Sequence, residues 1–204
     1  MSDTISAYVA AAIAGNLWQE SGINPGIWQS LSPGTWTDLR KGYGLCQWTN
    51  TGGNTQGRLY QLHKYLSENG YPDDSFEGQV KFIGEENYWT GPGTLQDFLH
   101  SDSTDINYLT EQWFLYWESP GDDTLPIRQG YAARCFAEMG SSGKPDTEIY
   151  SGNRYLSESE RLSNSRWLNY YLSGGIGGGG TGGGGTGGGT GKVPIWLLYK
   201  FRRC

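Results

Sequence analysis

A run of glycine and threonine near the end of the chain limits how much of it can fold into a packed domain. Residues 174–191 read GGIGGGGTGGGGTGGGTG and contain 14 of the 33 glycines. Such a run has almost no apolar surface to bury, and glycine loses more backbone freedom on ordering than any other residue. The sequence therefore predicts one domain over residues 1–173, a flexible linker over 174–191 and a hydrophobic and basic tail over 192–204.

Charge divides the chain at the same place. The residues before the linker include all 21 acidic and 11 of the 15 basic side chains, a net charge of −10, whereas the tail KVPIWLLYKFRRC carries +4. Binding to a phosphate backbone needs a basic surface, so we do not expect nucleic acid to be the partner of this domain. The tail combines apolar and basic residues, which suits docking onto another protein or an anionic surface.

Cysteine usage and the chain start exclude several classes of protein. The three cysteines, Cys46, Cys135 and Cys204, are widely spaced, and there are only two histidines, so neither a zinc site nor a disulfide framework is predicted. We expect buried reduced thiols, with Cys204 on the tail, and no metal or organic cofactor. The first residues lack a basic segment, and no stretch of about 18 apolar residues follows, so the sequence predicts neither a signal peptide nor a transmembrane segment.

The spacing of apolar residues predicts a mostly helical domain. Over residues 4–19 they recur at steps of three and four, and Gly22 suits a helix stop. The segment GYGLCQWTN, residues 42–50, has the glycines of tight turns and an alternation that suits a short strand. Further helices are predicted over residues 57–66, 76–88, 94–99, 108–116, 127–139 and 157–171. This pattern indicates an α+β domain.

One carboxylate stands near the predicted end of the first helix, in GNLWQESGINPGIWQ, residues 15–29. Glu20 lies between Trp18 and Trp28 in the sequence. A negative charge in the last helical turn opposes the helix dipole, and apolar neighbours disfavour a charged carboxyl. The sequence therefore favours a Glu20 carboxyl that stays protonated near neutral pH, with a solvated residue at the helix end as the alternative.

Two motifs in combination resemble the phage tail-type lysozymes, the muramidase modules of cell-wall-degrading enzymes carried on phage tails. The matching residues are Gly15, Asn16, Glu20, Ser21, Asn24 and Pro25, followed by Gly42, Gly44, Leu45, Gln47, Trp48 and Thr49. Arg58 matches the arginine that tends to follow. Glu118 and Pro120 resemble an acid-proline signature in which this chain has Ser119 instead of a basic residue. The resemblance covers about residues 1–140.

The resemblance implies a lysozyme-like fold in which Glu20 faces the short β segment across a sugar-binding cleft. In that setting Glu20 protonates the glycosidic oxygen between N-acetylmuramic acid and N-acetylglucosamine in peptidoglycan. The residues expected to contact the glycan are Trp28, Tyr43, Gln47, Trp48 and Glu118, with packing of the β segment as the alternative role of Tyr43, Gln47 and Trp48. The candidates for a second carboxylate are Asp38, Glu86 and Glu118, of which Glu118 also suits a structural hydrogen-bonding role, or none is essential, as in lytic transglycosylases.

The resemblance also implies a substrate, partner proteins and a location. Peptidoglycan glycan strands are the expected substrate, other phage tail proteins are candidate partners of the tail, and the expected location is the virion tail or the bacterial cell wall and periplasm. Three alternatives remain: a lytic transglycosylase, a phage tail protein that binds glycan without cutting it, and a cysteine peptidase or amidase using Cys46 with His63 or His100.

Overall fold

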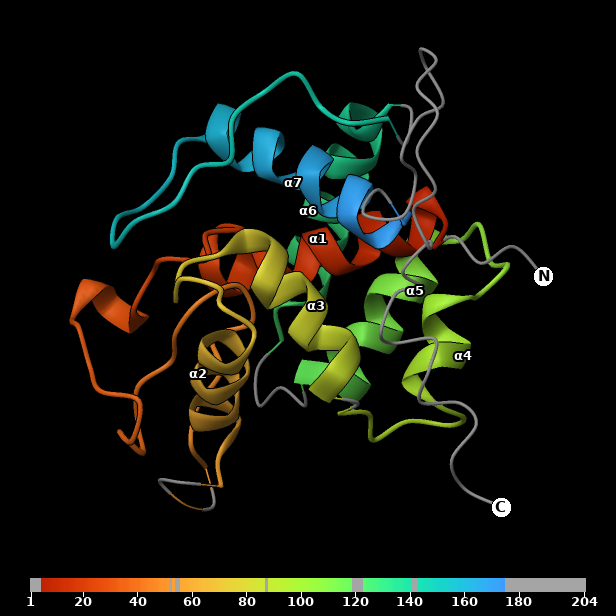
Figure 1. Cartoon of the computed structure of the whole chain (residues 1–204). Helices are drawn as coiled ribbons and strands as arrows, with labels where there is room; N and C mark the ends of the chain where they lie inside the picture. Colours follow the sequence, from red (N-terminus) through yellow and green to blue (C-terminus); the bar gives the residue numbers. More distant parts are fainter. Residues whose placement is uncertain are drawn as a thin grey trace, which may run out of the picture.

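The computed structural model describes residues 5–51, 53, 56–86, 88–118, 123–140 and 143–174. Helix α1 (Ala7–Ser21) lies at the centre of these residues and contacts α5 (Ile106–Trp113), α6 (Leu125–Met139) and α7 (Glu158–Leu172) (Figure 1). The other elements are the short turn η1 (Gln29–Leu31), α2 (Arg58–Glu68), α3 (Phe76–Glu86), α4 (Leu95–Leu99) and the π-helical turn η2 (Phe114–Glu118). The predicted linker beyond Gly174 and the tail lie outside the described residues.

Helix α1 is buried on all sides, more fully than its apolar spacing alone suggests. Residues 9–18 are all buried, including four alanines and Gly15. These small side chains let the flanking helices approach closely, and the most extensive contact is with α6. A helix enclosed in this way fixes the position of whatever stands at its end.

Gly15 marks the closest approach of α1 to α6. A Cβ atom added there would lie 2.6 Å from Ala132 Cβ and 2.6 Å from the carbonyl oxygen of Arg128. Alanine normally favours a helix over glycine by up to about 1 kcal/mol. We expect Gly15→Ala instead to destabilise the domain by about 1–3 kcal/mol, because the two helices must separate. Thermal or denaturant unfolding measures the change.

Gly130 provides the matched control. It lies within α6, it is exposed, and a Cβ atom added there meets nothing within 4 Å. Gly130→Ala should leave stability unchanged or raise it slightly. Equal stability of the two alanine variants would contradict the close packing of α1 on α6.

The predicted stop of the first helix is confirmed. Gly22 adopts a left-handed conformation with φ of 66°, and its N–H donates to the Trp18 carbonyl at 3.0 Å. The Gly22 bond is the 5→1 bond of a left-handed helix end, and the N–H of Ile23 also donates to the Leu17 carbonyl at 3.2 Å. Glu20 therefore lies in the last turn of α1, as predicted.

The predicted strand in the segment 42–50 does not form. The segment is a tight turn in which Tyr43 and Trp48 pair through two backbone hydrogen bonds of 3.2 and 3.0 Å, and Tyr43 also forms an isolated bridge with Trp28. The left-handed φ values of Gly44 and Gln47, 73° and 47°, interrupt extended backbone between the paired residues. Within the described residues, the β structure is limited to these two bridges.

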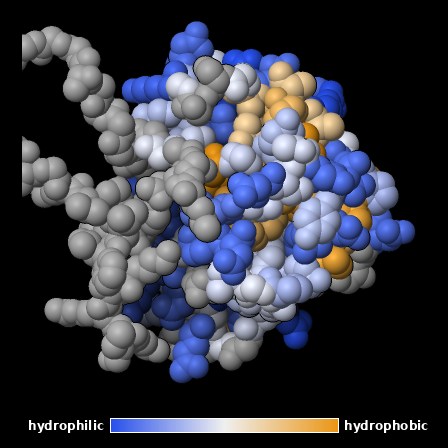
Figure 2. Space-filling view, turned by 90° about the vertical axis from the view of Figure 1, so that its right-hand side faces the viewer, coloured by the Kyte–Doolittle hydropathy of each residue, from blue (hydrophilic) through white to orange (hydrophobic). Residues whose placement is uncertain are grey.

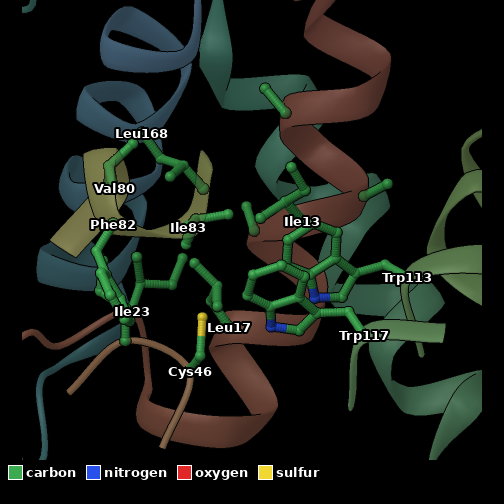
Figure 3. Close-up of a cluster of buried hydrophobic side chains, with 14 of the residues drawn as sticks. Ile13, Leu17, Ile23, Cys46, Val80, Phe82, Ile83, Trp113, Trp117 and Leu168 are labelled. Atoms are coloured by element: carbon green, nitrogen blue, oxygen red, sulfur yellow. The ribbon is translucent and has the colours of Figure 1, made fainter. Parts of the chain in front are cut away.

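The aromatic residues build much of the core. Trp113 and Trp117 stack with ring centroids 4.5 Å apart, and both indoles are fully buried beside α1. Figure 3 shows Cys46 pointing into the same cluster, near Leu17. The prediction of buried reduced thiols is confirmed for Cys46 and Cys135, while Cys204 lies outside the described residues.

The surface is mainly polar. On the face drawn in Figure 2, hydrophobic residues form patches separated by hydrophilic ones. The large apolar side chains that are most exposed, such as Ile127 and Tyr155, are distributed over different segments. In the described part of the chain, every helix is too short or too polar to cross a bilayer.

Candidate active site

Glu20 contacts a cation. Its Oε1 atom accepts a hydrogen bond of 2.5 Å from Nη2 of Arg128, at the start of α6, and 23% of the Glu20 side chain is exposed. The prediction that Glu20 lies in apolar surroundings is therefore wrong. The two tryptophans that flank Glu20 in the sequence pack on other rings: Trp18 stacks on Tyr131, and Trp28 packs against Tyr43.

Arg128 is held rigidly and is almost entirely buried. Its Nε donates to Thr124 Oγ1 at 2.9 Å, and its Nη1 lies 3.3 Å from Asn16 Oδ1 and 3.4 Å from the Asn16 carbonyl. The guanidinium also lies over the Phe114 ring, 4.9 Å from its centroid. With this many contacts, Arg128 fixes one oxygen of the Glu20 carboxylate.

The polar residues of the first motif attach the end of α1 to its neighbours. Asn16 donates to the carbonyl of Thr110 in α5 at 3.2 Å and also lies against Arg128. Ser21 donates to the Leu45 carbonyl at 2.8 Å, which links the helix end to the turn after Gly42. The spacing of the motif therefore has a structural reason: these side chains hold the segment that carries Glu20.

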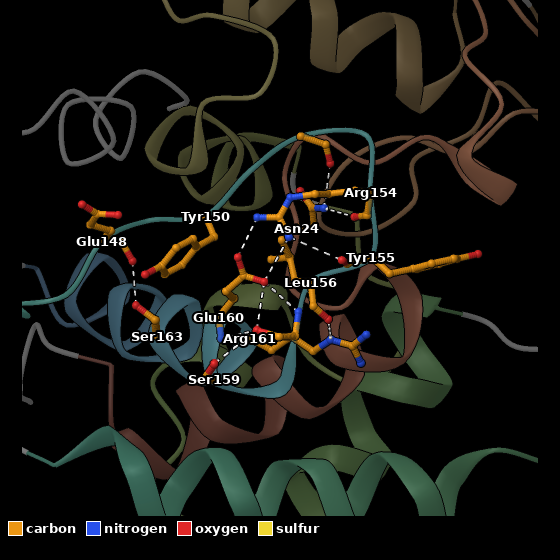
Figure 4. A network of polar contacts seen from close by, with 12 residues as sticks. Asn24, Glu148, Tyr150, Arg154, Tyr155, Leu156, Ser159, Glu160, Arg161 and Ser163 are labelled. Atoms are coloured by element: carbon orange, nitrogen blue, oxygen red, sulfur yellow. Dashed lines mark hydrogen bonds and ion pairs between the residues drawn. The ribbon is translucent and has the colours of Figure 1, made fainter.

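Asn24 extends this support to a distant part of the chain. Its amide donates to the carbonyls of Gly152 and Arg154, at 2.8 and 2.7 Å. Figure 4 shows Asn24 beside Arg154 and Glu160, which form an ion pair at the start of α7. Asn164 of α7 donates to the Ile23 carbonyl at 2.7 Å. The residues after Glu20 are thus braced by segment 148–156 and α7.

Glu118 is the carboxyl whose surroundings favour the protonated form. It ends η2, and its Oε1 accepts a hydrogen bond of 2.9 Å from the Trp113 indole. Burial raises the pKa of Glu118 to about 8, and the negative charge of Glu20 adds to the rise. Arg128, Arg58 and the Trp113 hydrogen bond act in the opposite direction. π-Helical turns recur at functional sites, and Glu118 is the last residue of this one.

Two of the three acids considered as a second carboxylate, Glu86 and Asp38, are engaged elsewhere. Both oxygens of Glu86 are bound: Arg58 donates to Oε1 at 2.5 Å and to Oε2 at 3.1 Å, and the Trp48 indole donates to Oε2 at 2.9 Å. Asp38 Oδ1 accepts from the backbone N–H of Arg40 at 3.0 Å within its own loop. Arg58 and Glu86 therefore form an ion pair.

The aromatic residues expected at the glycan divide into two groups. Tyr43 and Trp48 are buried, which fits their alternative role of packing the segment 42–50. Trp28 is half-buried, and its ring lies 5.3 Å from that of Trp36. The amide of Gln47 donates back to the Gly44 carbonyl at 3.1 Å.

Sequence reasoning missed part of this aromatic group. Trp36 stacks on His63 with centroids 4.5 Å apart and planes 1° apart. His63 in turn contacts Asp73, with Nδ1 2.9 Å from Oδ1. Trp36 lies in a loop without periodicity, and His63 lies on α2, so no local sequence pattern links the two.

The geometry does not suit cysteine catalysis. Burial raises the pKa of Cys46 well above its ordinary value, whereas a nucleophilic cysteine needs a lowered one. His63 is engaged with Trp36 and Asp73. Among the described residues there is also no group of three or more His, Cys, Asp or Glu side chains that could hold a metal ion.

Comparison with known proteins finds similarity to a phage protein family and to a phage protein. A family model described as phage tail lysozyme matches residues 1–139. Morphogenesis protein 1 of Bacillus phage B103 is 32% identical over 144 residues, which cover 66% of this chain and 35% of that protein. The chain thus spans about a third of the length of this relative.

Proposed function

Because the chain belongs to the phage tail lysozyme family, whose members are associated with peptidoglycan hydrolysis, we propose that it cleaves the bond between N-acetylmuramic acid and N-acetylglucosamine. Glu20 is the general acid of this proposal. It stands at the end of the buried helix α1, it is partly exposed, and the motif residues hold the segment around it. The placement of one accessible carboxyl at a rigid helix end is the observation that carries the proposal.

Arg128 fits the role of Glu20 once the proton has moved. A general acid is neutral before the reaction and negatively charged after it, so a fixed cation beside it stabilises the charge that develops in the transition state.

The hydrogen bonds of Glu86 and Asp38 bear on whether a second carboxylate takes part in the reaction. Retaining and inverting glycosidases both use a second carboxylate, at separations of roughly 5–9.5 Å from the first. Glu86 is saturated by Arg58 and Trp48, and Asp38 caps its own loop. Burial raises the pKa of Glu118 to about 8, which makes this third acid a poor nucleophile. Together these surroundings favour a second candidate function, that of a lytic transglycosylase, in which the substrate's acetamido group replaces the protein nucleophile.

Mass spectrometry of digested peptidoglycan tests the function and separates the two reactions. Products ending in reducing N-acetylmuramic acid indicate hydrolysis, and products ending in the anhydro sugar indicate transglycosylation. We expect soluble muropeptides of one of these types. Intact glycan at every pH between roughly 4.5 and 8 would overturn the proposal and favour a tail protein that binds glycan without cutting it.

The family places the chain in a phage context, and we propose that it acts on the cell wall from the virion tail or after release to the wall or periplasm. The residues after 191, with their net charge of +4, are the segment proposed to dock onto other tail proteins. A chain truncated after Ser173 should then cleave soluble glycan at the full rate, which a solution assay measures.

A further inference from the structure

An arginine in the first turn of α7 contacts the end of the helix that carries Glu20. The Arg161 side chain packs against Gly22, where its Nε and Cζ atoms would lie 3.1 and 3.3 Å from an added Cβ atom. Its guanidinium carbon lies 5.6 Å from the centroid of the Trp18 ring. Its Nε donates to the Leu156 carbonyl at 2.8 Å, which fixes the direction of the group. A cation is thus held beside Gly22, two residues after Glu20.

This arginine has no acidic partner in the part of the chain that the structure describes. The two acids in the first turn of α7 bind other arginines. Glu158 pairs with Arg134 of α6. Glu160 pairs with Arg154 of the preceding segment. Among the described residues, the two Nη groups of Arg161 have no hydrogen-bond acceptor. The positive charge of Arg161 is therefore not neutralised locally, although residues 1–173 carry a net charge of −10.

Stabilisation of α1 explains only part of this arrangement. A cation near the last carbonyls of a helix interacts favourably with the helix dipole, and the stem of an arginine can cover an indole. Neither role needs Nη groups without acceptors. Figure 4 shows the Arg161 guanidinium pointing away from Glu160, to the side on which Tyr155 extends. Tyr155 is 67% exposed, more than any other large apolar side chain in the described segments. An available cation and an exposed ring suit an anionic ligand with an apolar neighbour.

We propose that Arg161, with Tyr155 beside it, binds a carboxylate of the peptide stem of peptidoglycan while Glu20 acts on the glycan strand. The inference rests on the proposed function. Stem peptides are attached to N-acetylmuramic acid, one of the two sugars at the bond to be cleaved, and they end in a free carboxylate. Guanidinium groups bind carboxylates through parallel N–H donors, and Arg161 has its Nη donors available.

The distance from the acid fits such a substrate. At helical spacing the Cα atoms of Glu20 and Gly22 are about 5.5 Å apart, which puts the Arg161 guanidinium within about 15 Å of the Glu20 carboxyl. An extended peptide spans up to about 3.5 Å per residue, so a stem of about four residues covers this distance. Residues 148–161 follow the range 1–139 that the family model matches, so the family match assigns no role to Arg161.

The test compares solubilised peptidoglycan with the same material after its carboxyls have been converted to amides. We expect the ratio of the two KM values to change about tenfold between the wild type and Arg161→Gln, because a hydrogen bond to a charged group contributes about tenfold or more to binding. The change should come from a higher KM on the native material. A merely structural role of Arg161 would alter both substrates in proportion and leave the ratio unchanged.

Two further variants separate the site from general charge effects. Arg166→Gln removes the same charge from α7, where Arg166 pairs with Glu138, and it should keep the wild-type KM ratio. Arg161→Lys should recover part of the preference for the native material, because an ammonium keeps the charge but not the planar pair of donors. A ratio that changes equally in Arg161→Gln and Arg166→Gln would overturn the site.

A titration of the full wild-type chain with a free four-residue stem peptide depends neither on catalysis nor on the folding of a variant. The backbone amide NMR signals of Gly22 and Leu156, which the Arg161 side chain contacts, should shift with this peptide and not with its carboxyl-amidated form. Signals that ignore the peptide at millimolar concentration would overturn the site, as would an unchanged KM ratio in folded Arg161→Gln. A wild-type protein that leaves both peptidoglycan samples intact overturns the proposed function instead, and the peptide titration then still decides whether the carboxylate site exists.

Discussion

Glu20→Gln should reduce peptidoglycan cleavage about 10³-fold, because proton donation to the leaving group contributes about 10²–10⁴-fold in enzymes of this kind. Glutamine keeps the shape of the side chain, and its oxygen can accept the hydrogen bond that Arg128 now donates to Glu20. It has no acidic proton to donate. The rate of release of soluble muropeptides from purified peptidoglycan measures the loss.

The fold should survive this change. Arg128 keeps its contacts with Asn16 and Thr124, so its charge remains hydrogen-bonded. Glu68→Gln serves as the control, since it removes a carboxylate from an exposed helix end, and it should retain full activity. A Glu20→Gln protein that is folded and cleaves at the wild-type rate would remove Glu20 from the mechanism.

Local patterns in the sequence predicted much of the fold. The apolar spacing located the helices to within a few residues, and Gly22 ends α1 in a left-handed turn as expected. The prediction of a short strand in residues 42–50 was wrong, because the alternation of side chains in the sequence cannot reveal that Gly44 and Gln47 adopt left-handed backbone conformations. The family resemblance is confirmed by the match over residues 1–139.

The surroundings of the candidate acid could not be predicted in the same way. Arg128 stands 108 residues after Glu20, in a helix whose sequence carries no motif, and the packing of α6 on α1 brings the two together. The same limit applies to Glu118, whose pKa depends on the charges of Glu20, Arg128 and Arg58, all distant in the sequence or on other helices. Sequence identified the acidic residues, but the charges that determine which of them holds a proton come from long-range contacts.

Replacing Arg128 with methionine should cause the largest loss of stability, about 3 kcal/mol, because removal of one partner of a buried ion pair typically costs 3–5 kcal/mol and Glu20 is partly exposed. Methionine approximates the volume of the side chain but supplies none of its donors, so the Asn16 and Thr124 oxygens also lose a partner. Denaturant unfolding at pH 7 measures the change. Cleavage should fall as well, since nothing then fixes the Glu20 carboxylate.

Arg134→Met provides the comparison that separates burial from charge. Arg134 pairs with Glu158 between α6 and α7, and both side chains are more than half exposed, so its removal should cost no more than about 1 kcal/mol. Arg128→Lys should recover only part of the stability, because one ammonium cannot reach Glu20, Asn16 and Thr124 together. Combining Arg128→Met with Glu20→Gln should destabilise less than the sum of the two, because the double variant leaves no unpaired carboxylate. Equal stability of the Arg128→Met and Arg134→Met proteins would show that Arg128 does not hold the acid.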